Sequence, residues 1–146
     1  MPDVREITAL DAHPLRRSVL RRDMEKPDVH YPQDDDPQAF HLGAFDGDEL
    51  VGIASFSPAP TIYRGGAAGW QLRGMAVDDT RQISGVGRAL IAAAMSRLRA
   101  DGAHVLWCNA RDTALGFYEK QGFNVYGDGF VTADSGLPHH VMVCDL

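Results

Sequence analysis

Residues 70–98 read WQLRGMAVDDTRQISGVGRALIAAAMSRL, and this stretch constrains the fold more than any other part of the chain. Residues 70–77 form a short apolar run that ends at two aspartates, which predicts a buried strand. Residues 81–87 are polar and contain glycine, which predicts a loop. The apolar residues that follow recur at helical spacing and predict a helix with one buried face, made of Val86, Leu90, Ile91, Ala94, Met95 and Leu98.

The predicted loop has the features of an anion-binding site. Residues 82–87 read QISGVG and fit the pattern Q-x-x-G-x-G, with Arg88 next. Gly85 and Gly87 lack a Cβ atom, so the backbone can turn tightly and approach a bulky anion. The helix N-terminus adds backbone N–H groups and the positive end of a dipole, which suit a phosphate group. The spacing differs from the dinucleotide motif G-x-G-x-x-G, and no Lys-Ser or Lys-Thr pair follows the glycines as in a nucleotide P-loop.

Length and composition are typical of one globular domain that spans residues 1–146. The net charge of −6 and the lack of a basic patch argue against nucleic acid as a partner. No apolar run reaches the roughly 20 residues of a membrane span, and residues 1–10 contain no signal-peptide core, so we expect a cytoplasmic protein without a membrane partner. Cys108 and Cys144 lie in predicted strands without metal-type spacing, which favours buried thiols and no metal site.

The first half of the chain predicts a strand, a helix and a hairpin. Residues 4–8 favour a strand, and residues 11–24 favour an amphipathic helix. Residues 25–38 contain prolines and an acidic run, which predicts a loop. Residues 40–56 place an Asp-Gly turn between two apolar runs, which predicts a β-hairpin. The arginines of the predicted helix are expected on its solvated face: Arg16, Arg17, Arg21 and Arg22.

The second half of the chain predicts a strand parallel to residues 70–77. Residues 104–110 are mostly apolar and predict a buried strand, and a helix separates them along the chain from the earlier strand. The two strands are therefore expected to be parallel neighbours. Asp112 or Thr113 would cap a short helix that follows. The last expected elements are two antiparallel strands within residues 123–128 and 138–145.

Two motifs together resemble the GCN5-related N-acetyltransferase (GNAT) family. The first is the Q-x-x-G-x-G loop with its flanking strand and helix. The second is residues 109–123, NARDTALGFYEKQGF, which fit N-x-x-x-x-A-x-x-F-Y-x-x-x-G-F. The resemblance covers residues 70–123 closely and the flanking elements more loosely. It implies an α/β (α+β) fold: a mixed central sheet of about seven strands, helices on both faces, and two central parallel strands splayed around an acyl-CoA site.

The resemblance also implies how acetyl-CoA is held. The backbone of residues 75–77 would pair with the pantetheine arm, and the N–H group of Val77 could polarise the thioester carbonyl. The N–H groups of residues 83–88 would hold the pyrophosphate, and Asn109 would bond the pantetheine amides. Alternatively, Asn109 is a strand-end residue satisfied by local backbone. The implied acetyl-CoA contacts are Met75, Ala76, Val77, Gln82, Ile83, Ser84, Gly85, Val86, Gly87, Arg88, Asn109 and Phe117.

Transfer to an amine also needs an acid for the leaving thiolate and a base for the amine. Tyr118 is the candidate acid, because a phenol with a pKa of about 10 is protonated at neutral pH yet close to the pKa of a thiol. Alternatively, Tyr118 only packs. The sequence leaves the identity of the general base open: it could be one of four side chains, or a water molecule relayed by backbone carbonyl groups. The resemblance favours His139, because residues 138–140 begin the last strand, which in the family passes near the reaction centre, and related members often carry a Pro-His pair there. The other candidate side chains are Glu49, His41 and His140.

The function expected from this resemblance is acetyl-CoA-dependent transfer of an acetyl group to a primary amine of a small molecule or a protein. In the family, residues 25–38 lie near the acceptor, where the run Asp34, Asp35 and Asp36 would attract a cationic amine. Alternatively, these charges belong to a solvated loop. A non-catalytic acyl-CoA-binding module and a nucleotide-binding protein are the competing interpretations. Relatives often pair, so a homodimer is possible.

Overall fold

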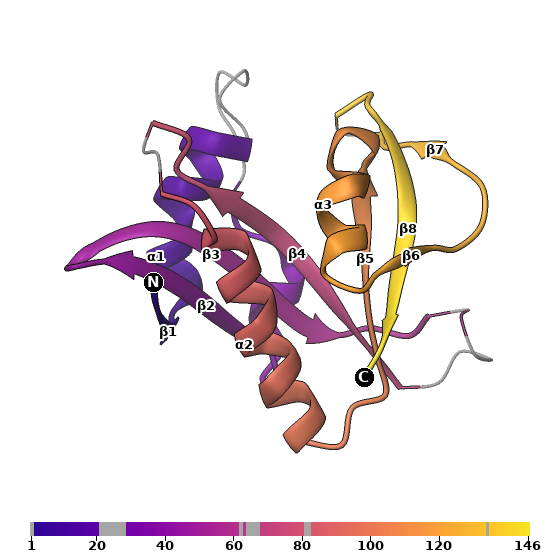
Figure 1. Cartoon of the computed structure of the whole chain (residues 1–146), viewed down its shortest axis with the longest axis horizontal. Helices are drawn as coiled ribbons and strands as arrows, with labels where there is room; N and C mark the ends of the chain where they lie inside the picture. The colour runs from indigo at the N-terminus through magenta and orange to yellow at the C-terminus, as the bar shows by residue number, and fades with distance from the viewer. Residues whose placement is uncertain (1, 21–28, 62, 64–67, 81–82, 134) are drawn as a thin grey trace. The chain divides into compact units, whose positions relative to one another are not determined.

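The computed structural model describes residues 2–20, 29–61, 63, 68–80, 83–133 and 135–146. The helices and strands follow the order expected for a mixed α/β fold (Figure 1). They are β1 (Asp3–Ile7), α1 (Ala9–Leu15), the π-helix η1 (Arg16–Leu20), the 3-10 helix η2 (Pro32–Asp35), β2 (Phe40–Asp46), β3 (Glu49–Pro58), β4 (Gly69–Val77), α2 (Val86–Ala100), β5 (Val105–Arg111), the 3-10 helix η4 (Asp112–Ala114), α3 (Leu115–Lys120), β6 (Asn124–Val125), β7 (Phe130–Val131) and β8 (Pro138–Asp145).

The predicted fold class is confirmed. Within the described ranges, eight strands form a mixed sheet in the hydrogen-bonded order β1-β2-β3-β4-β5-β8-β6, with β7 paired to β8. The chain divides into two compact units. Unit 1 comprises Met1–Ser57 and Arg73–Ser96, and unit 2 comprises Pro58–Leu72 and Arg97–Leu146. Strand β4 and helix α2 each contribute residues to both units, and the units are described in turn.

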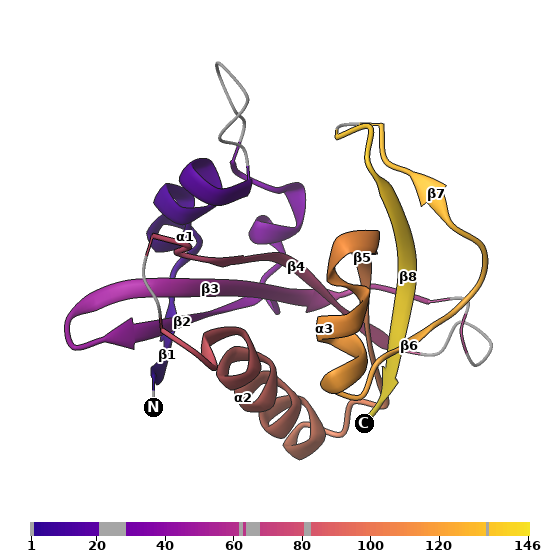
Figure 2. The ribbon, with the colours of Figure 1, turned by 45° about the horizontal axis from the view of Figure 1, so that its top comes forward.

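In unit 1 the sheet is built from antiparallel strands and carries a helix on each face. The predicted hairpin is confirmed, because β2 pairs with β3 and Gly47 turns the chain with φ of +61°. Ile53 of β3 packs with Ala12 of α1. The preceding Gly52 faces the other way, where an added Cβ would lie 2.4 Å from Val86 Cγ1 at the start of α2. Successive strand residues point to opposite faces, so α1 and α2 cover opposite sides of these strands (Figure 2).

Helix α2 confirms the periodicity argument. It begins at Val86, at the position where the apolar spacing begins. Every residue of the predicted apolar face is buried, which leaves the polar face to solvent. The backbone of Gly102, with φ of +81°, and the bond from Ala103 N–H to the Leu98 carbonyl oxygen end the helix.

The first helix differs from the prediction. Thr8 and Asp11 form a capping box, so α1 starts at Ala9 and is seven residues long. The chain then widens into a π-helix from Arg16 to Leu20, and residues 21–24 lie outside the described part. The expected solvated arginine face is wrong at Arg16, whose side chain is fully buried, whereas Arg17 is exposed. Arg21 and Arg22 also lie outside the described residues.

In unit 2, β5 forms the predicted parallel pair with the start of β4. The pairing joins Gly69–Leu72 to Val105–Cys108, and both strands continue past it. On its other side β5 pairs antiparallel with β8 along its whole length, and the two-residue strands β6 and β7 also pair with β8. The closing antiparallel pair is thus confirmed, while β7 was not expected. Both cysteines are buried free thiols, as predicted.

The short helix after β5 is present, but its predicted cap is wrong. A 3-10 turn, Asp112–Ala114, precedes α3, and neither helix start has a side-chain cap. Asp112 instead bonds a histidine of β8. The end of α3 behaves as the sequence indicates, because Gly122 adopts φ of +99° and Phe123 N–H bonds the Tyr118 carbonyl oxygen. None of the helices in the described residues has the length and hydropathy needed to cross a membrane.

Candidate functional site

The loop before α2 has the backbone arrangement of an anion-binding turn. Gly85 adopts φ of +81°, and its carbonyl oxygen accepts the first helical bond from Ala89 N–H at 3.0 Å. The first N–H groups of any α-helix have no partner within the helix, and those of α2 begin at Val86. Val86 is buried and anchors the turn, whereas Ser84 and Arg88 are exposed. Gln82 of the predicted motif lies outside the described residues.

Strand β4 brings the predicted pantetheine-binding backbone into the same unit. Ala76 is buried, and Met75 and Val77 are partly exposed. Just before them Gly74 adopts φ of +61°, which is unusual within a strand. A Cβ atom there would lie 3.0 Å from the Tyr31 ring and 3.2 Å from Arg16 Nε. Glycine therefore lets these two side chains approach the strand.

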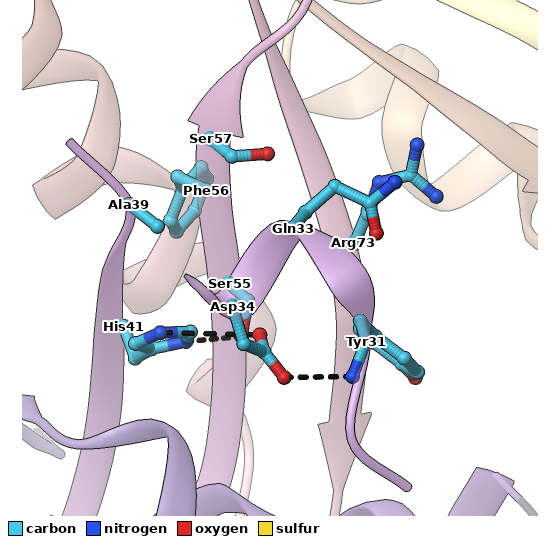
Figure 3. Close-up of a pocket in the computed structure, with 9 residues that line it drawn as sticks. All are labelled: Tyr31, Gln33, Asp34, Ala39, His41, Ser55, Phe56, Ser57 and Arg73. Carbon is cyan, nitrogen blue, oxygen red and sulfur yellow. Dashed lines mark hydrogen bonds and ion pairs between the residues drawn. The ribbon is translucent and has the colours of Figure 1, made fainter. Parts of the chain in front are cut away.

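A polar pocket lies on unit 1 beside this part of β4 (Figure 3). Its volume is about 180 Å³, including space open to solvent. Residues from η2, β2, β3 and β4 contribute to its wall. They are Tyr31, Gln33, Asp34, Ala39, His41, Ser55, Phe56, Ser57 and Arg73.

A buried ion pair forms the floor of this region. The two terminal nitrogens of Arg16 bond the two carboxylate oxygens of Asp34 at 2.6 and 3.0 Å. Arg16 also donates to Ser55 Oγ at 2.7 Å, and its guanidinium lies 4.0 Å from the centre of the Tyr31 ring. Burial alone would raise the pKa of Asp34, but the bonds from Arg16 and from the Tyr31 N–H outweigh it and lower that pKa. Asp34 is thus a carboxylate whose oxygens are already engaged.

His41 borders the same carboxylate. Its Nδ1 lies 2.7 Å from Ser55 Oγ, and its Nε2 lies 4.0 Å from a carboxylate oxygen of Asp34. Burial lowers the pKa of His41, which the Asp34 charge only partly offsets and the Arg16 charge reinforces. The imidazole is therefore neutral at pH 7.

Unit 1 holds a further group of possible ligand atoms. Atoms of His13, His30 and Asp34 lie within 4.8 Å of one another. The Asp34 oxygens already accept bonds from Arg16, so we assign no metal to this group.

Unit 2 holds the predicted acid and the predicted pantetheine-binding amide. Asn109 is exposed on β5, opposite Val141 of β8. Tyr118 is buried on α3, with its ring in edge contact with Phe117 and Phe123 at centroid distances of 5.1 and 5.4 Å. Burial raises the pKa of the Tyr118 phenol, and the nearby Cys108 adds to this effect. The phenol is therefore fully protonated at neutral pH.

Two histidines at the start of β8 have different surroundings. His139 is buried against Phe130, and its Nδ1 lies 2.8 Å from the Leu137 carbonyl oxygen. A carbonyl only accepts, so Nδ1 carries the proton and Nε2 is the basic nitrogen of the neutral ring. His140 is partly exposed, and its Nδ1 lies 2.7 Å from Asp112 Oδ1.

The structure thus groups the predicted residues by unit. The loop of residues 83–88 and the segment of residues 75–77 belong to unit 1, while Asn109, Phe117, Tyr118 and His139 belong to unit 2. Sequence reasoning missed two arrangements. The pocket with Arg73 had no recognisable motif, and the His140–Asp112 pair joins residues that are distant along the chain.

Comparisons with known proteins identify the relatives of this fold. Residues 4–123 match the Acetyltransferase (GNAT) family. The uncharacterized N-acetyltransferase YitI of Bacillus subtilis (strain 168) is 32% identical over 143 residues, covering 98% of this chain and 95% of the relative. FeeM, an N-acyl amino acid synthase from uncultured soil microbes, matches with a TM-score of 0.82 at 17% identity over 99% of this chain and 92% of its own. An aminoglycoside 6'-N-acetyltransferase complexed with coenzyme A matches with a TM-score of 0.75 at 18% identity over 98% and 96%.

The fold and these relatives define the class of protein: the chain is an acetyltransferase. Because the family match extends over most of the chain, the chain belongs to the GNAT family. Acceptors in this family are amines. The resemblance stated from the two sequence motifs is thereby confirmed.

Proposed function

We propose that the protein transfers an acetyl group from acetyl-CoA directly to a primary amine of a small molecule or a protein. The observation that carries the proposal is the turn at Gly85, where an exposed residue with a positive φ angle directly precedes a 15-residue helix. Such a turn presents N–H groups and a helix dipole to an anion, and the pyrophosphate of acetyl-CoA is an anion of suitable chemistry. The GNAT family match and the coenzyme A complex of a structural relative support this use.

Donor binding is assigned to backbone and a few side chains. In the proposal, the N–H groups of residues 83–88 hold the pyrophosphate, with Gln82 and Arg88 at the ends of the loop. The backbone of residues 75–77 pairs with the pantetheine arm, and Val77 N–H polarises the thioester carbonyl. Asn109 and Phe117 of unit 2 contribute the remaining contacts. The exposure of Asn109 leaves its amide able to bond a ligand.

Tyr118 is the proposed general acid. In the reaction the amine nitrogen bonds the acetyl carbon, the carbon–sulfur bond breaks, and the thiolate takes a proton from the phenol. The raised pKa of Tyr118 keeps that proton available throughout the neutral range. The same shift makes proton release harder, so transfer depends on the thiolate charge that develops beside the phenol.

A histidine of β8 is proposed to take the proton that the amine must lose. In His139, Nδ1 donates its proton to the Leu137 carbonyl oxygen, so the lone pair that could accept a proton is on Nε2. His140 is the second candidate, because the Asp112 carboxylate beside Nδ1 orients the imidazole and leaves Nε2 as the basic nitrogen. The two differ in burial, since His139 is buried and His140 is partly exposed.

The test is an amine screen with acetyl-CoA in which release of the CoA thiol and the mass of the product are both followed. Acetylated product is expected with the wild type. Tyr118→Phe is expected to lower kcat by roughly 10²–10⁴-fold while acetyl-CoA affinity stays within a few fold. Acetyl-CoA binding with no product from any amine would favour the non-catalytic acyl-CoA-binding module instead. Unchanged kcat in Tyr118→Phe would remove the phenol from the mechanism.

A further inference from the structure

The polar pocket of unit 1 contains a buried hydroxyl that has no hydrogen-bond partner. Ser57 is 3% exposed, and its Oγ bonds no group in the part of the chain that the structure describes. We propose that Ser57 binds the amine acceptor, and that the pocket takes an uncharged hydrogen-bonding group of that acceptor, a hydroxyl or a carboxamide. The pocket is an acceptor site only if the protein acetylates an amine, so this proposal rests on the proposed function. Such an acceptor differs from the cationic one that the acidic run of residues 34–36 predicts.

Ser55, two positions earlier on β3, shows how a serine is used structurally in the same pocket. It is also buried, but its Oγ accepts a bond from Arg16 at 2.7 Å and lies 2.7 Å from His41 Nδ1. Residues two apart in a strand point to the same face, so Ser57 faces the same side of β3. A buried hydroxyl without a partner costs stability. A ligand that supplies the partner on binding accounts for the serine at position 57.

The charged groups of the pocket are already engaged within the protein. Arg16 neutralises the Asp34 carboxylate through two bonds, and the Tyr31 N–H donates a third. An ammonium group would therefore find the Asp34 oxygens occupied. His41 is neutral at pH 7 because burial lowers its pKa. Arg73 also interacts with other parts of the protein, so its charge is not assigned to a ligand.

The side chains of Ser57 and Gln33 suit a ligand that both donates and accepts hydrogen bonds. A hydroxyl and a carboxamide each combine a donor with an acceptor. Ser57 belongs to β3 and Gln33 to η2, and the Ser57 hydroxyl points away from Phe56 toward the side of the pocket where Gln33 is drawn (Figure 3). A carboxylate only accepts and an ammonium only donates, so either would match just part of this pair. A hydroxyl or a carboxamide of the acceptor can match both members.

Size and position fit one small group of an acceptor. At about 180 Å³, the pocket is below the usual range for drug-sized ligands, so it suits one polar group and its nearest carbons. Phe56 and Ala39 offer apolar contact to those carbons. Tyr31 also lines the pocket, and a Cβ atom at Gly74 of β4 would lie 3.0 Å from its ring. Because Gly74 directly precedes residues 75–77, a group held in the pocket is anchored beside the backbone proposed to bind the acyl arm.

Matched amines test the chemistry of the acceptor on the unaltered protein. Amino alcohols and amino acid amides are compared with alkylamines, amino acids and diamines of equal length, over a range of chain lengths. The kcat/KM is measured with acetyl-CoA, and the affinity by calorimetry without it. The uncharged polar amine is expected to exceed each of its counterparts by at least about tenfold, because an apolar counterpart leaves the Ser57 hydroxyl unpaired.

The series also identifies the group that the pocket binds. Preference for the amino alcohols indicates a hydroxyl, and preference for the amides indicates a carboxamide. Equal use of the alkylamines overturns the proposal. So does a preference for the amino acids or for the diamines, because the pocket would then select a charged group.

Serine variants show whether the preference comes from this pocket. Ser57→Ala is expected to reduce the preference for the polar amine over the alkylamine by at least about tenfold, and Ser57→Thr, which keeps a hydroxyl, to retain part of it. Ser96→Ala is the control, because Ser96 is an exposed residue of α2 that does not line the pocket. Survival of the full preference in Ser57→Ala, or its loss in Ser96→Ala, would contradict the assignment.

Thermal unfolding without ligand gives a test that needs no acceptor. Because Ser57 Oγ makes no bond in the free protein, Ser57→Ala is expected to leave the Tm unchanged or to raise it. Ser55→Ala removes the contacts to Arg16 and His41, and is expected to lower the Tm by a few degrees. An equal decrease of the Tm in both variants would mean that the Ser57 hydroxyl is bonded inside the protein, which overturns the proposal.

The proposed function and the Ser57 site fail in different ways. If acetyl-CoA neither binds nor reacts, the function fails, and the site is judged on the calorimetric titrations alone. Tighter binding of the polar amines by the wild type than by Ser57→Ala would support the site in that case. If acetyl transfer proceeds and alkylamines or charged amines are preferred, the function stands and the Ser57 site is wrong. Binding of none of the polar amines also overturns the site.

Discussion

The guanidinium of Arg16 and the carboxylate of Asp34 form a two-point ion pair at 2.6 and 3.0 Å inside unit 1. The contact joins the π-helix η1 to the 3-10 helix η2 and lies beneath the polar pocket. It engages Asp34, the first carboxylate of the acidic run, inside the unit. Burial of both partners makes the pair sensitive to the loss of either one.

Arg16→Met is expected to lower the free energy of unfolding by about 3–5 kcal/mol, because it leaves the Asp34 charge buried without its partner. Urea unfolding measures the change. Arg5→Met is the matched control, since Arg5 pairs with Asp3 on the surface, where the side chains are 49% and 62% exposed. That control should change stability by at most ~1 kcal/mol. Equal changes in the free energy of unfolding for the two variants would mean that the buried pair contributes no more to stability than the exposed one.

Because of His41, we expect the free energy of unfolding to decrease on mild acidification. Its pKa in the folded protein is below the value of 6.5 for an unperturbed histidine, chiefly because it is buried. Between those two pKa values the unfolded chain binds more protons than the folded one, so stability falls as the pH decreases. The contribution is complete above pH 6.5 and declines from there toward the folded pKa. Urea unfolding at several pH values from 7.5 to 5 measures this change in the free energy of unfolding.

The variant His41→Gln should flatten this pH dependence, even if it lowers stability at every pH. His104→Gln is the control, because His104 is exposed and directly precedes β5. A pH slope that is unchanged in His41→Gln would assign the proton uptake to other groups.

Gly85→Ala separates backbone strain from ligand binding. A Cβ atom at Gly85 meets nothing within 4 Å, so its cost is the left-handed φ angle, about 1–2 kcal/mol of stability. Gly47 of the hairpin turn has the same properties, with φ of +61° and open space. Both variants should lose similar stability in urea unfolding. Only Gly85→Ala should weaken acetyl-CoA binding, by about tenfold or more, as calorimetry would show.

Two histidine variants distinguish between the two candidate general bases. If His139 is the base, His139→Ala lowers kcat by roughly 10²–10⁴-fold, and Asp112→Asn has little effect. If His140 is the base, His140→Ala does so, and Asp112→Asn also lowers kcat, because Nδ1 of His140 loses the carboxylate that orients the ring. Steady-state rates across pH 5.5–9 measure both. Full activity in both histidine variants would favour a relayed water.

The elements that the sequence predicts best are those whose signal is local. Helix α2 is read from the spacing of its own apolar residues, and all six of them are buried. The β2–β3 hairpin is read from one Asp-Gly turn, and β4 and β5 from apolar runs joined by a helix. Each of these patterns depends on residues within one element or in consecutive elements of the chain. Contacts with distant residues therefore change the predicted structure little.

The features that were missed depend on partners far away in the chain. Arg16 looks like a surface residue until Asp34, 18 positions later, provides a buried partner. Asp112 looks like a helix cap until His140, 28 positions later, takes its carboxylate. Strand β7 has only two residues and forms by pairing with β8. The periodicity of a sequence reports only the local preference of each residue. It therefore does not reveal a pairing with a distant residue that overrides this preference.

The most direct test of the proposed function is thermal unfolding with acetyl-CoA, CoA and ATP, each added in large excess. A ligand at about 100 times its Kd stabilises the native state by roughly 2.7 kcal/mol, which corresponds to a shift of a few degrees for a chain of this size. A shift with acetyl-CoA and CoA, reduced in Gly85→Ala but not in Gly47→Ala, and none with ATP, is the expected result. The absence of a shift with either CoA compound, or an equal shift with ATP, would contradict the assignment of the Gly85 turn to an acyl-CoA donor.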